Sequence, residues 1–414
     1  MKNTILLLFV FLLCGCYSSS KISNRNLAFL YGPNTSYLNP SFKVSHSSEG
    51  KSLLHFKFDS NDLLYMKEKE VFEANFDVTI ESYSSFESKV VLDTLTKNYN
   101  LKNKPGADSD LYHFIEFDNA SLSSYLIKVT IYDINRNSKS ISYIDINKGN
   151  ENLPQFFSLK LSDSNIPLFR NHIASDETFV VSHANPETER LWVRYYNRRF
   201  PLAAPPHSQK GAQIFSFISD STFSVEVNSE LNFKKPGIYH IQKDTLQKNG
   251  VTLFRLHNDF PNLTAANQLL EPLRYLTTRE EYKNIIESSN KRSAIDAYWL
   301  QLAGSKERAR FLIKNYYNRV QTSNQFFTSY LEGWKTDRGL IYIVFGVPSG
   351  IYKSSDSEVW TYANTSYTSA INFTFKKISN PFSTNDYVLV RKPEYEFEWY
   401  KAVETWRKGR IVNL

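Results

Sequence analysis

The chain contains few of the residues that characterise several classes of protein. Its 414 residues include only 2 cysteines, 14 glycines and 15 prolines, which excludes disulfide-stapled scaffolds, collagen-like chains and low-complexity chains. Adjacent basic residues occur only as isolated pairs and the formal net charge is +7, so we expect no nucleic-acid partner. Aromatic residues, by contrast, make up 15% of the chain. This content, over a length that suits two or three domains of about 150 residues, predicts several buried cores.

The N-terminus contains an apolar run that is too short to cross a membrane. Ile5–Leu13 comprises nine apolar residues, whereas a membrane-spanning helix needs about 20, so the run is typical of a signal peptide. The next residues, Leu13-Cys14-Gly15-Cys16, resemble a bacterial lipobox. The resemblance implies cleavage of a signal peptide at 1–15, acylation of Cys16 with groups such as palmitate, and a lipidated tether over 16–50. The alternative is an ordinary secretory signal with a cysteine at this position by chance.

The first half of the mature chain alternates apolar and polar residues, which predicts β-strands. Between 51 and 150 the clearest strand is Tyr125–Ile134, and Val90-Val91-Leu92 is a further candidate. Short strands separated by polar turns predict a β-sandwich there and a second sandwich-like domain over 151–260. In the second domain we expect Ala203-Ala204-Pro205-Pro206 to be an exposed loop.

Helical periodicity begins near residue 261. Thr278-Arg279-Glu280-Glu281 fits a capping box at the start of a helix, and residues 306–322 repeat apolar side chains every three or four positions. Alternation at 371–375 and an apolar run at 387–390 predict strands. Residues 261–414 are therefore expected to form an α+β domain, with helices and a small antiparallel sheet.

Within that domain, residues 325–350 read QFFTSYLEGWKTDRGLIYIVFGVPSG. We expect Phe326–Glu332 to close a helix, with Gly333 at positive φ beyond its C-terminus. Thr336-Asp337-Arg338-Gly339 suits a tight turn. Leu340–Phe345 is apolar on both faces, which predicts a central strand covered on both sides. Gly346-Val347-Pro348 then ends that strand.

The same residues resemble the GWxTD family, a domain family of Bacteroidetes and related bacteria. The shared positions are Gly333, Trp334, Thr336, Asp337, Arg338, Gly339, Gly346, Pro348, Glu358, Trp360 and Tyr362. The resemblance covers roughly 263–414 and implies a lipoprotein signal and preceding β-domains, but it supplies no catalytic residues. A looser resemblance, in the Phe-Gly-x-Pro and Trp-x-Tyr elements, is to small outer-membrane lipoproteins that accompany the β-barrel assembly machine and bind partners.

Acidic residues are absent just after the expected lipid anchor. No Asp or Glu occurs between Cys16 and Glu49, whereas surface-exported lipoproteins of the Bacteroidetes often carry acidic residues there. We therefore expect an outer-membrane anchor that faces the periplasm and not the cell surface. Loss of Lys2 with the signal peptide leaves a mature charge of 48 − 42 = +6. This small excess of positive charge would suit a protein that works near anionic lipid or polysaccharide. Alternatively, it only keeps the protein soluble.

Tryptophan is concentrated in the last third of the chain. Five of the six tryptophans lie there, at Trp299, Trp334, Trp360, Trp399 and Trp406. One interpretation is that they form the core of the α+β domain. The other is that Trp299, Trp399 and Trp406 contribute to an exposed aromatic surface that binds a glycan or a protein.

No catalytic or metal-binding motif is recognisable. All eight histidines precede residue 258 and none pairs at metal-ligand spacing, so we expect no metal, no cofactor and no catalytic residue. Asp337 and Glu358 are the one imaginable acid/base pair. A carboxylate in a turn, however, is more often a cap than a catalyst.

These features predict a non-catalytic lipoprotein of the outer membrane. It would act as a structural or partner-binding subunit of a cell-envelope protein assembly, such as one in outer-membrane protein biogenesis or secretion. A second hypothesis is an envelope module that binds glycan or peptidoglycan through the clustered aromatic residues. A third hypothesis is a carboxylate-dependent hydrolase built around Asp337.

Overall fold

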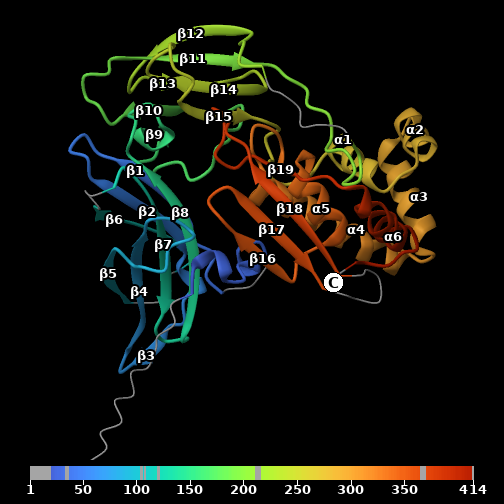
Figure 1. Ribbon diagram of the computed structural model, residues 1–414, viewed down its shortest axis with the longest axis horizontal. Coiled ribbons are helices and arrows are strands. Elements are labelled where there is room, and N and C mark those ends of the chain that lie inside the picture. The colour runs from blue at the N-terminus through green and yellow to red at the C-terminus, as the bar shows by residue number, and fades with distance from the viewer. Residues whose placement is uncertain are drawn as a thin grey trace, which may run out of the picture.

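The computed structural model describes residues 20–32, 37–102, 106, 109–118, 122–209, 216–363 and 370–412. The expected signal peptide at 1–15 and the expected lipidation site, Cys16, lie outside the described residues. No helix in the described part of the chain is long and apolar enough to cross a membrane. The chain forms two β-domains, at the left and top of Figure 1, and a C-terminal α+β domain at the right.

The first β-domain is a sandwich of two antiparallel sheets, as predicted. One sheet has the order β1-β2-β6 and the other β3-β4-β7-β8, with β5 paired to β4. Phe56, Phe76 and Val129 are fully buried in the core shared by the sheets. The strands are β1 (Ser41–His46), β2 (Ser52–Asp59), β3 (Met66–Glu68), β4 (Val71–Tyr83), β5 (Asp93–Lys102), β6 (Asp110–Phe117), β7 (Ser124–Asp133) and β8 (Ser138–Asn147).

The second β-domain also has two antiparallel sheets, in the orders β13-β10-β9 and β12-β11-β14-β15. Its core contains the fully buried Phe157, Phe179 and Ile241. The strands are β9 (Phe157–Leu161), β10 (Phe179–His183), β11 (Arg190–Tyr196), β12 (Ser221–Glu226), β13 (Glu230–Leu231), β14 (Gly237–Gln242) and β15 (Val251–Arg255). Period-two alternation identified both β-domains because most strands bury one face, although β14 and β15 are buried on both faces.

The α+β domain combines helices with the sheet β16-β17-β18-β19. The predicted capping box is confirmed, since Glu281 N–H donates to Thr278 Oγ1 at 3.2 Å and Thr278 N–H to Glu281 Oε2 at 2.7 Å. The helices are α1 (Ala266–Leu270), α2 (Arg279–Glu287), α3 (Lys291–Ala303), α4 (Lys306–Phe327), α5 (Asp337–Phe345) and α6 (Glu396–Arg407). The strands are β16 (Gly350–Lys353), β17 (Ser357–Tyr362), β18 (Ile371–Lys377) and β19 (Tyr387–Leu389).

The prediction of a central strand at Leu340–Phe345 is wrong, because these residues belong to the helix α5. Every residue of α5 is buried, and the helix contacts α4, α6 and β19. A helix covered on all sides shows no 3.6-residue apolar stripe, so its sequence resembles that of a buried strand. The predicted tight turn at Thr336–Gly339 is instead the N-terminus of this helix.

The tether expected over 16–50 is also wrong where the structure describes it. Ile22–Asn24 and Ala28–Leu30 are 3-10 turns, and β1 already begins at Ser41. Ile22 and Leu27 are buried against the first β-domain, in a cluster with Phe86. The segment 20–32 therefore packs as part of the fold, and Figure 1 shows its blue turns between the first β-domain and β16.

Candidate functional site

Two glycines of the signature, Gly333 and Gly339, allow neighbouring stretches of backbone to pack in direct contact. A Cβ atom on Gly333 would lie 1.8 Å from the carbonyl oxygen of Ser323 in α4, and one on Gly339 would lie 2.0 Å from the carbonyl oxygen of Gly333. The predicted helix end at Glu332 is wrong because α4 stops at Phe327, and Gly333 begins a separate 3-10 turn, Gly333–Lys335. Gly333 is thus required for close packing and not for a left-handed helix cap.

Trp334 and Thr336 join this turn to its neighbours. Trp334 is 3% exposed, and its carbonyl oxygen accepts a hydrogen bond of 2.9 Å from the hydroxyl of Tyr275. Thr336 Oγ1 donates to Gly333 O at 2.7 Å and accepts from Gly339 N–H at 3.0 Å. Thr336 is therefore the N-cap of α5.

Asp337 forms an ion pair with Arg391. Both Arg391 Nη atoms donate to the carboxylate, with Nη1 3.0 Å from Oδ2, and Leu389 N–H donates to Oδ2 at 2.7 Å. The Asp337 side chain is 9% exposed. This carboxylate therefore connects the start of α5 to β19 and to the chain just beyond it.

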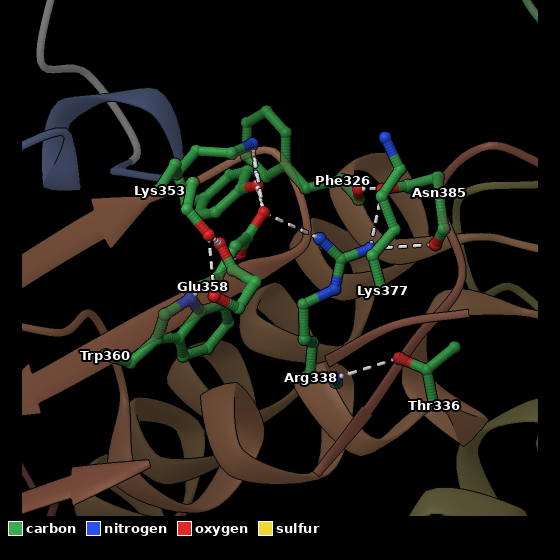
Figure 2. A network of polar contacts seen from close by, with 12 residues as sticks. Phe326, Thr336, Arg338, Lys353, Glu358, Trp360, Lys377 and Asn385 are labelled. Carbon is green, nitrogen blue, oxygen red and sulfur yellow. Dashed lines mark hydrogen bonds and ion pairs between the residues drawn. The ribbon is translucent and has the colours of Figure 1, made fainter. Parts of the chain in front are cut away.

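Glu358 is the centre of a buried network that Figure 2 shows from close by. Its Oε1 accepts from Tyr31 Oη at 2.9 Å and lies 2.9 Å from Lys353 Nζ and 3.3 Å from Arg338 Nη1. Its Oε2 accepts from Trp360 Nε1 at 3.0 Å. The side chains of Glu358 and Arg338 are 0% and 1% exposed. The network thus holds α5, β16, β17 and the N-terminal segment together.

The electrostatics of the network keep Glu358 ionised. Burial alone would raise the pKa of Glu358, but the Lys353 and Arg338 cations and the hydrogen bonds from Lys353 and Trp360 lower it to about 2. Burial and the charge of Glu358 raise the pKa of Tyr31, so its hydroxyl stays protonated and donates. A carboxylate that is fixed as an anion by four donors is a structural ion and is poorly suited to proton transfer.

The remaining signature positions close the end of α5. Gly346 has φ of 85°, and a Cβ there would lie 2.6 Å from Arg319 Nη2. Tyr362 Oη donates to Gly346 O at 2.9 Å. Pro348 is buried two residues further on. The predicted sharp end after Phe345 is therefore correct, although it ends a helix and not a strand.

The tryptophans proposed for an exposed surface lie in the core. Trp299 and Trp406 are 0% exposed and Trp399 is 4% exposed. Trp406 Nε1 donates to Val344 O at 2.9 Å, and the ring of Trp406 lies edge-on to that of Tyr316. The hypothesis of a binding surface formed by these three side chains is wrong, because the helices α3, α4 and α6 bury them against α5 and the sheet.

A cleft of about 1000 Å³ lies beside the signature. Its lining includes Arg274, Asp337, Tyr387, Arg391, Tyr400 and Arg407, together with one edge of Trp399. Cations and aromatic rings thus meet at its wall, which suits recognition of polar and carbonyl-rich ligands. Among the described residues, no group of three or more His, Cys, Asp or Glu side chains could hold a metal ion.

Residues 201–205 of the second β-domain form one rim of the cleft. We call the segment 201–206 the strap. Ala203 N–H donates to Lys335 O at 3.1 Å, Arg391 Nη2 donates to Ala204 O at 3.1 Å, and Lys392 N–H donates to Pro206 O at 3.2 Å. Leu202 and Ala203 pack against the core of the α+β domain. The segment 203–206 is a loop, as expected, but only Pro205 of its four residues is exposed.

Sequence reasoning missed the partners of the signature residues. Tyr31, Lys353 and Arg391 hold Glu358 and Asp337, and Tyr31 is 327 positions from Glu358. No local pattern marks such a pair, because the contact exists only after three distant segments fold together. The strap offered a weak signal in its three prolines, which favour an extended backbone.

Comparisons with known proteins assign one part of the chain to a domain family. No curated protein matches the chain. The solved structure of red sea bream transglutaminase matches 50% of this chain and 28% of its own chain, at 9% identity and a TM-score of 0.20, which is too low to support any argument. Residues 237–408, from β14 to just beyond α6, match the family model described as "GWxTD domain". The chain therefore contains a GWxTD domain, which begins earlier than the resemblance over 263–414 indicated.

Proposed function

We propose that this chain is a lipoprotein anchored in the outer membrane through Cys16. In this proposal it has no catalytic role, and its GWxTD domain binds a protein partner within a cell-envelope assembly that handles outer-membrane protein biogenesis or secretion. The anchor faces the periplasm. The partner binds in the cleft beside the signature.

The observation that carries the proposal is the strap. An extended, proline-containing segment already lies along the cleft. All three of its hydrogen bonds use its own main-chain groups, which pair with the main chain of Lys335 and Lys392 and with the guanidinium of Arg391. Main-chain recognition of this kind is independent of side-chain identity. The same wall of Arg391, Tyr400 and Lys335 offers donors and an aromatic face to an extended segment of another protein.

The state of the two signature carboxylates supports a binding role over hydrolysis. Asp337 is engaged by Arg391 and by Leu389 N–H, and Glu358 by four side-chain donors. General acid/base catalysis requires a carboxyl group that exchanges its proton near the working pH. The pKa of Glu358 is lowered to about 2, mainly because the Lys353 and Arg338 cations outweigh its burial. The engagement of both carboxylates therefore supports a binding role over a hydrolase built around Asp337 and Glu358.

The test is gentle detergent extraction of the chain with an affinity tag after Leu414, followed by identification of co-purifying proteins. We expect a stoichiometric partner with the wild type. Tyr400→Ala should reduce its recovery about tenfold, because Tyr400 lines the cleft and is 56% exposed. Phe397→Ala is the matched control, since Phe397 is on the same helix and 71% exposed but does not line the cleft. Equal recovery from both variants, or a wild type without a partner, would contradict the proposal.

Glycan binding is the second candidate function. Tyr330, Tyr387, Tyr400 and the edge of Trp399 line the cleft, and aromatic rings with adjacent polar groups suit sugar rings. The wild type and Tyr400→Ala would be incubated with purified cell wall and sedimented. Retention of the wild type and loss of Tyr400→Ala would favour glycan as the ligand. Failure of the wild type to sediment would eliminate this candidate.

A further inference from the structure

Three consecutive aliphatic side chains project into solvent between β4 and β5. Val90, Val91 and Leu92 are 63%, 40% and 46% exposed. Sequence periodicity predicted a strand at these residues, but they precede β5, which begins at Asp93. Isolated exposed aliphatic residues are common, whereas a contiguous apolar run on a surface marks a contact with another phase or molecule.

The run is held in a defined conformation. The hydroxyl of Ser88 donates to Val90 O and accepts from Val90 N–H, both at 3.1 Å. Leu92 N–H donates to Ser82 O at 2.8 Å. The backbone of the loop is therefore fixed at both ends, and the three side chains are presented without a large loss of chain entropy on binding.

This loop lies beside the first described residues of the chain. Ser23 N–H donates to Phe86 O at 2.9 Å, and Ile22 and Phe86 share one buried cluster. On its other side, the Glu87 carboxylate accepts from Ser355 N–H at 2.9 Å and from Ser355 Oγ at 2.7 Å. The apolar run is thus attached to both the N-terminal segment and the hairpin between β16 and β17.

Only a short stretch of chain separates the first described residue from the proposed lipid anchor at Cys16. Ser20, the first described residue, follows Cys16 by four positions, so at most about 14 Å of extended chain separates them. A lipid-anchored Cys16 would therefore keep Ser20, and the loop fixed near it, within reach of the headgroup region of the bilayer.

The charges around the run suit an anionic lipid surface. Lys21, Arg25 and Lys89 are exposed. Two acidic groups are nearby, but Glu87 is occupied by Ser355 and Asp93 follows the run at the start of β5. Basic residues close to an anionic membrane surface are attracted to it.

We propose that Val90-Val91-Leu92 inserts into the phospholipid headgroup layer as a second membrane contact, with Lys21, Arg25 and Lys89 facing anionic headgroups. The proposal rests on the lipid anchor at Cys16. An anchor at one residue leaves the attached domain free to reorient, whereas a second contact through the protein itself fixes its orientation. The first β-domain and the GWxTD domain would then be held at a set angle to the membrane.

The test uses the full lipidated chain with one added thiol, Val91→Cys, labelled with an environment-sensitive fluorophore. Cys14 leaves with the signal peptide and Cys16 is acylated, so the added thiol is the one that reacts. The protein is reconstituted into vesicles of phosphatidylethanolamine and phosphatidylglycerol that contain nitroxide-labelled lipid. Leu246→Cys, at a position that is 93% exposed between β14 and β15, is the matched control.

We expect the lipid nitroxide to quench the label at position 91 about fivefold more than the label at position 246. Equal quenching at the two positions would overturn the proposal. So would shielding of position 91 from water-soluble quenchers without quenching by lipid, because that result indicates self-association.

The anchor is measured separately, by the mass of the N-terminal peptide and by vesicle flotation of the wild type and Cys16→Ser. An acylated, floating chain with an unquenched position 91 overturns the loop contact and leaves the anchor intact. An unacylated chain that does not float overturns both.

Discussion

At the scale of single residues, the signature uses its charged groups to hold the fold together. Glu358 accepts hydrogen bonds from Tyr31 and Trp360 and pairs with Lys353 and Arg338. Asp337 forms an ion pair with Arg391. A buried ion pair contributes little net stability when both partners are present, but loss of one partner leaves an uncompensated charge in the core.

Substitution Glu358→Gln should therefore lower the free energy of unfolding of the GWxTD domain by about 3–5 kcal/mol. The variant leaves Arg338, which is 1% exposed, without its counter-ion. Urea unfolding followed by tryptophan fluorescence measures the change. Asp356→Asn, on the same hairpin at a 76% exposed side chain, should leave the midpoint near that of the wild type. Similar midpoints for both variants would show that the buried pair is unimportant.

The same carboxylate predicts a dependence on pH. The pKa of Glu358 falls from an ordinary value of 4.5 to about 2 in the folded state. Its contribution is therefore complete above pH 4.5 and is lost as the pH falls toward 2. The stability difference between wild type and Glu358→Gln should accordingly shrink as the pH falls from about 4.5 toward about 2. A difference that stays constant over this range would contradict the assigned ionisation.

At the scale of elements, sequence patterns predicted the sheets better than the helix of the signature. Phe373 and Phe375 alternate in β18 as expected, because one face of that strand is buried. Thr336, in contrast, caps a helix in which every residue from Asp337 to Phe345 is buried. The helix is covered on all sides, so its periodic signal is lost. Thr336, the N-cap residue, is the one local feature of the sequence that indicates a helix here.

Because Gly333 packs directly against α4, the substitution Gly333→Ala should strongly destabilise the GWxTD domain. The new Cβ would lie 1.8 Å from the main-chain oxygen of Ser323, so the 3-10 turn must move away from α4. We expect a loss of at least about 3 kcal/mol in thermal or urea unfolding. Gly304→Ala is the control, since its Cβ meets open space at φ of 74° and should cost about 1 kcal/mol. Equal losses would disprove the close-approach role of Gly333.

At the scale of the whole molecule, the N-terminal segment joins the first β-domain to the GWxTD domain. Asn26 Nδ2 donates to Ser349 O at 2.9 Å, and Ile351 N–H donates to Asn26 Oδ1 at 3.0 Å. Leu27 N–H donates to Ile351 O at 2.7 Å. These contacts span more than 300 positions, which is why the sequence suggested only a tether.

Substitution Asn26→Ala should loosen this junction without unfolding either domain. Hydrogen exchange of the peptide that contains Leu27 should accelerate about tenfold, as expected for the loss of roughly 1.4 kcal/mol of local stability. Asn24→Ala, at a neighbouring exposed position, should leave the exchange rate close to that of the wild type. Unchanged exchange in Asn26→Ala would indicate that other contacts hold the segment.

We expect Asp337 to act through its ion pair with Arg391 and not through chemistry, and a rescue experiment separates these two roles. Asp337→Asn and Arg391→Gln are made singly and together, and partner recovery through the C-terminal tag is measured with the Tm of each variant. Each single substitution leaves one unpaired charge, whereas the double variant replaces the pair by neutral amides that hydrogen-bond.

Both single variants should lower Tm and partner recovery, and the double variant should restore both toward wild-type values. A double variant with restored Tm but no recovered partner would contradict this expectation, because the charge of Asp337 would then be needed beyond the fold.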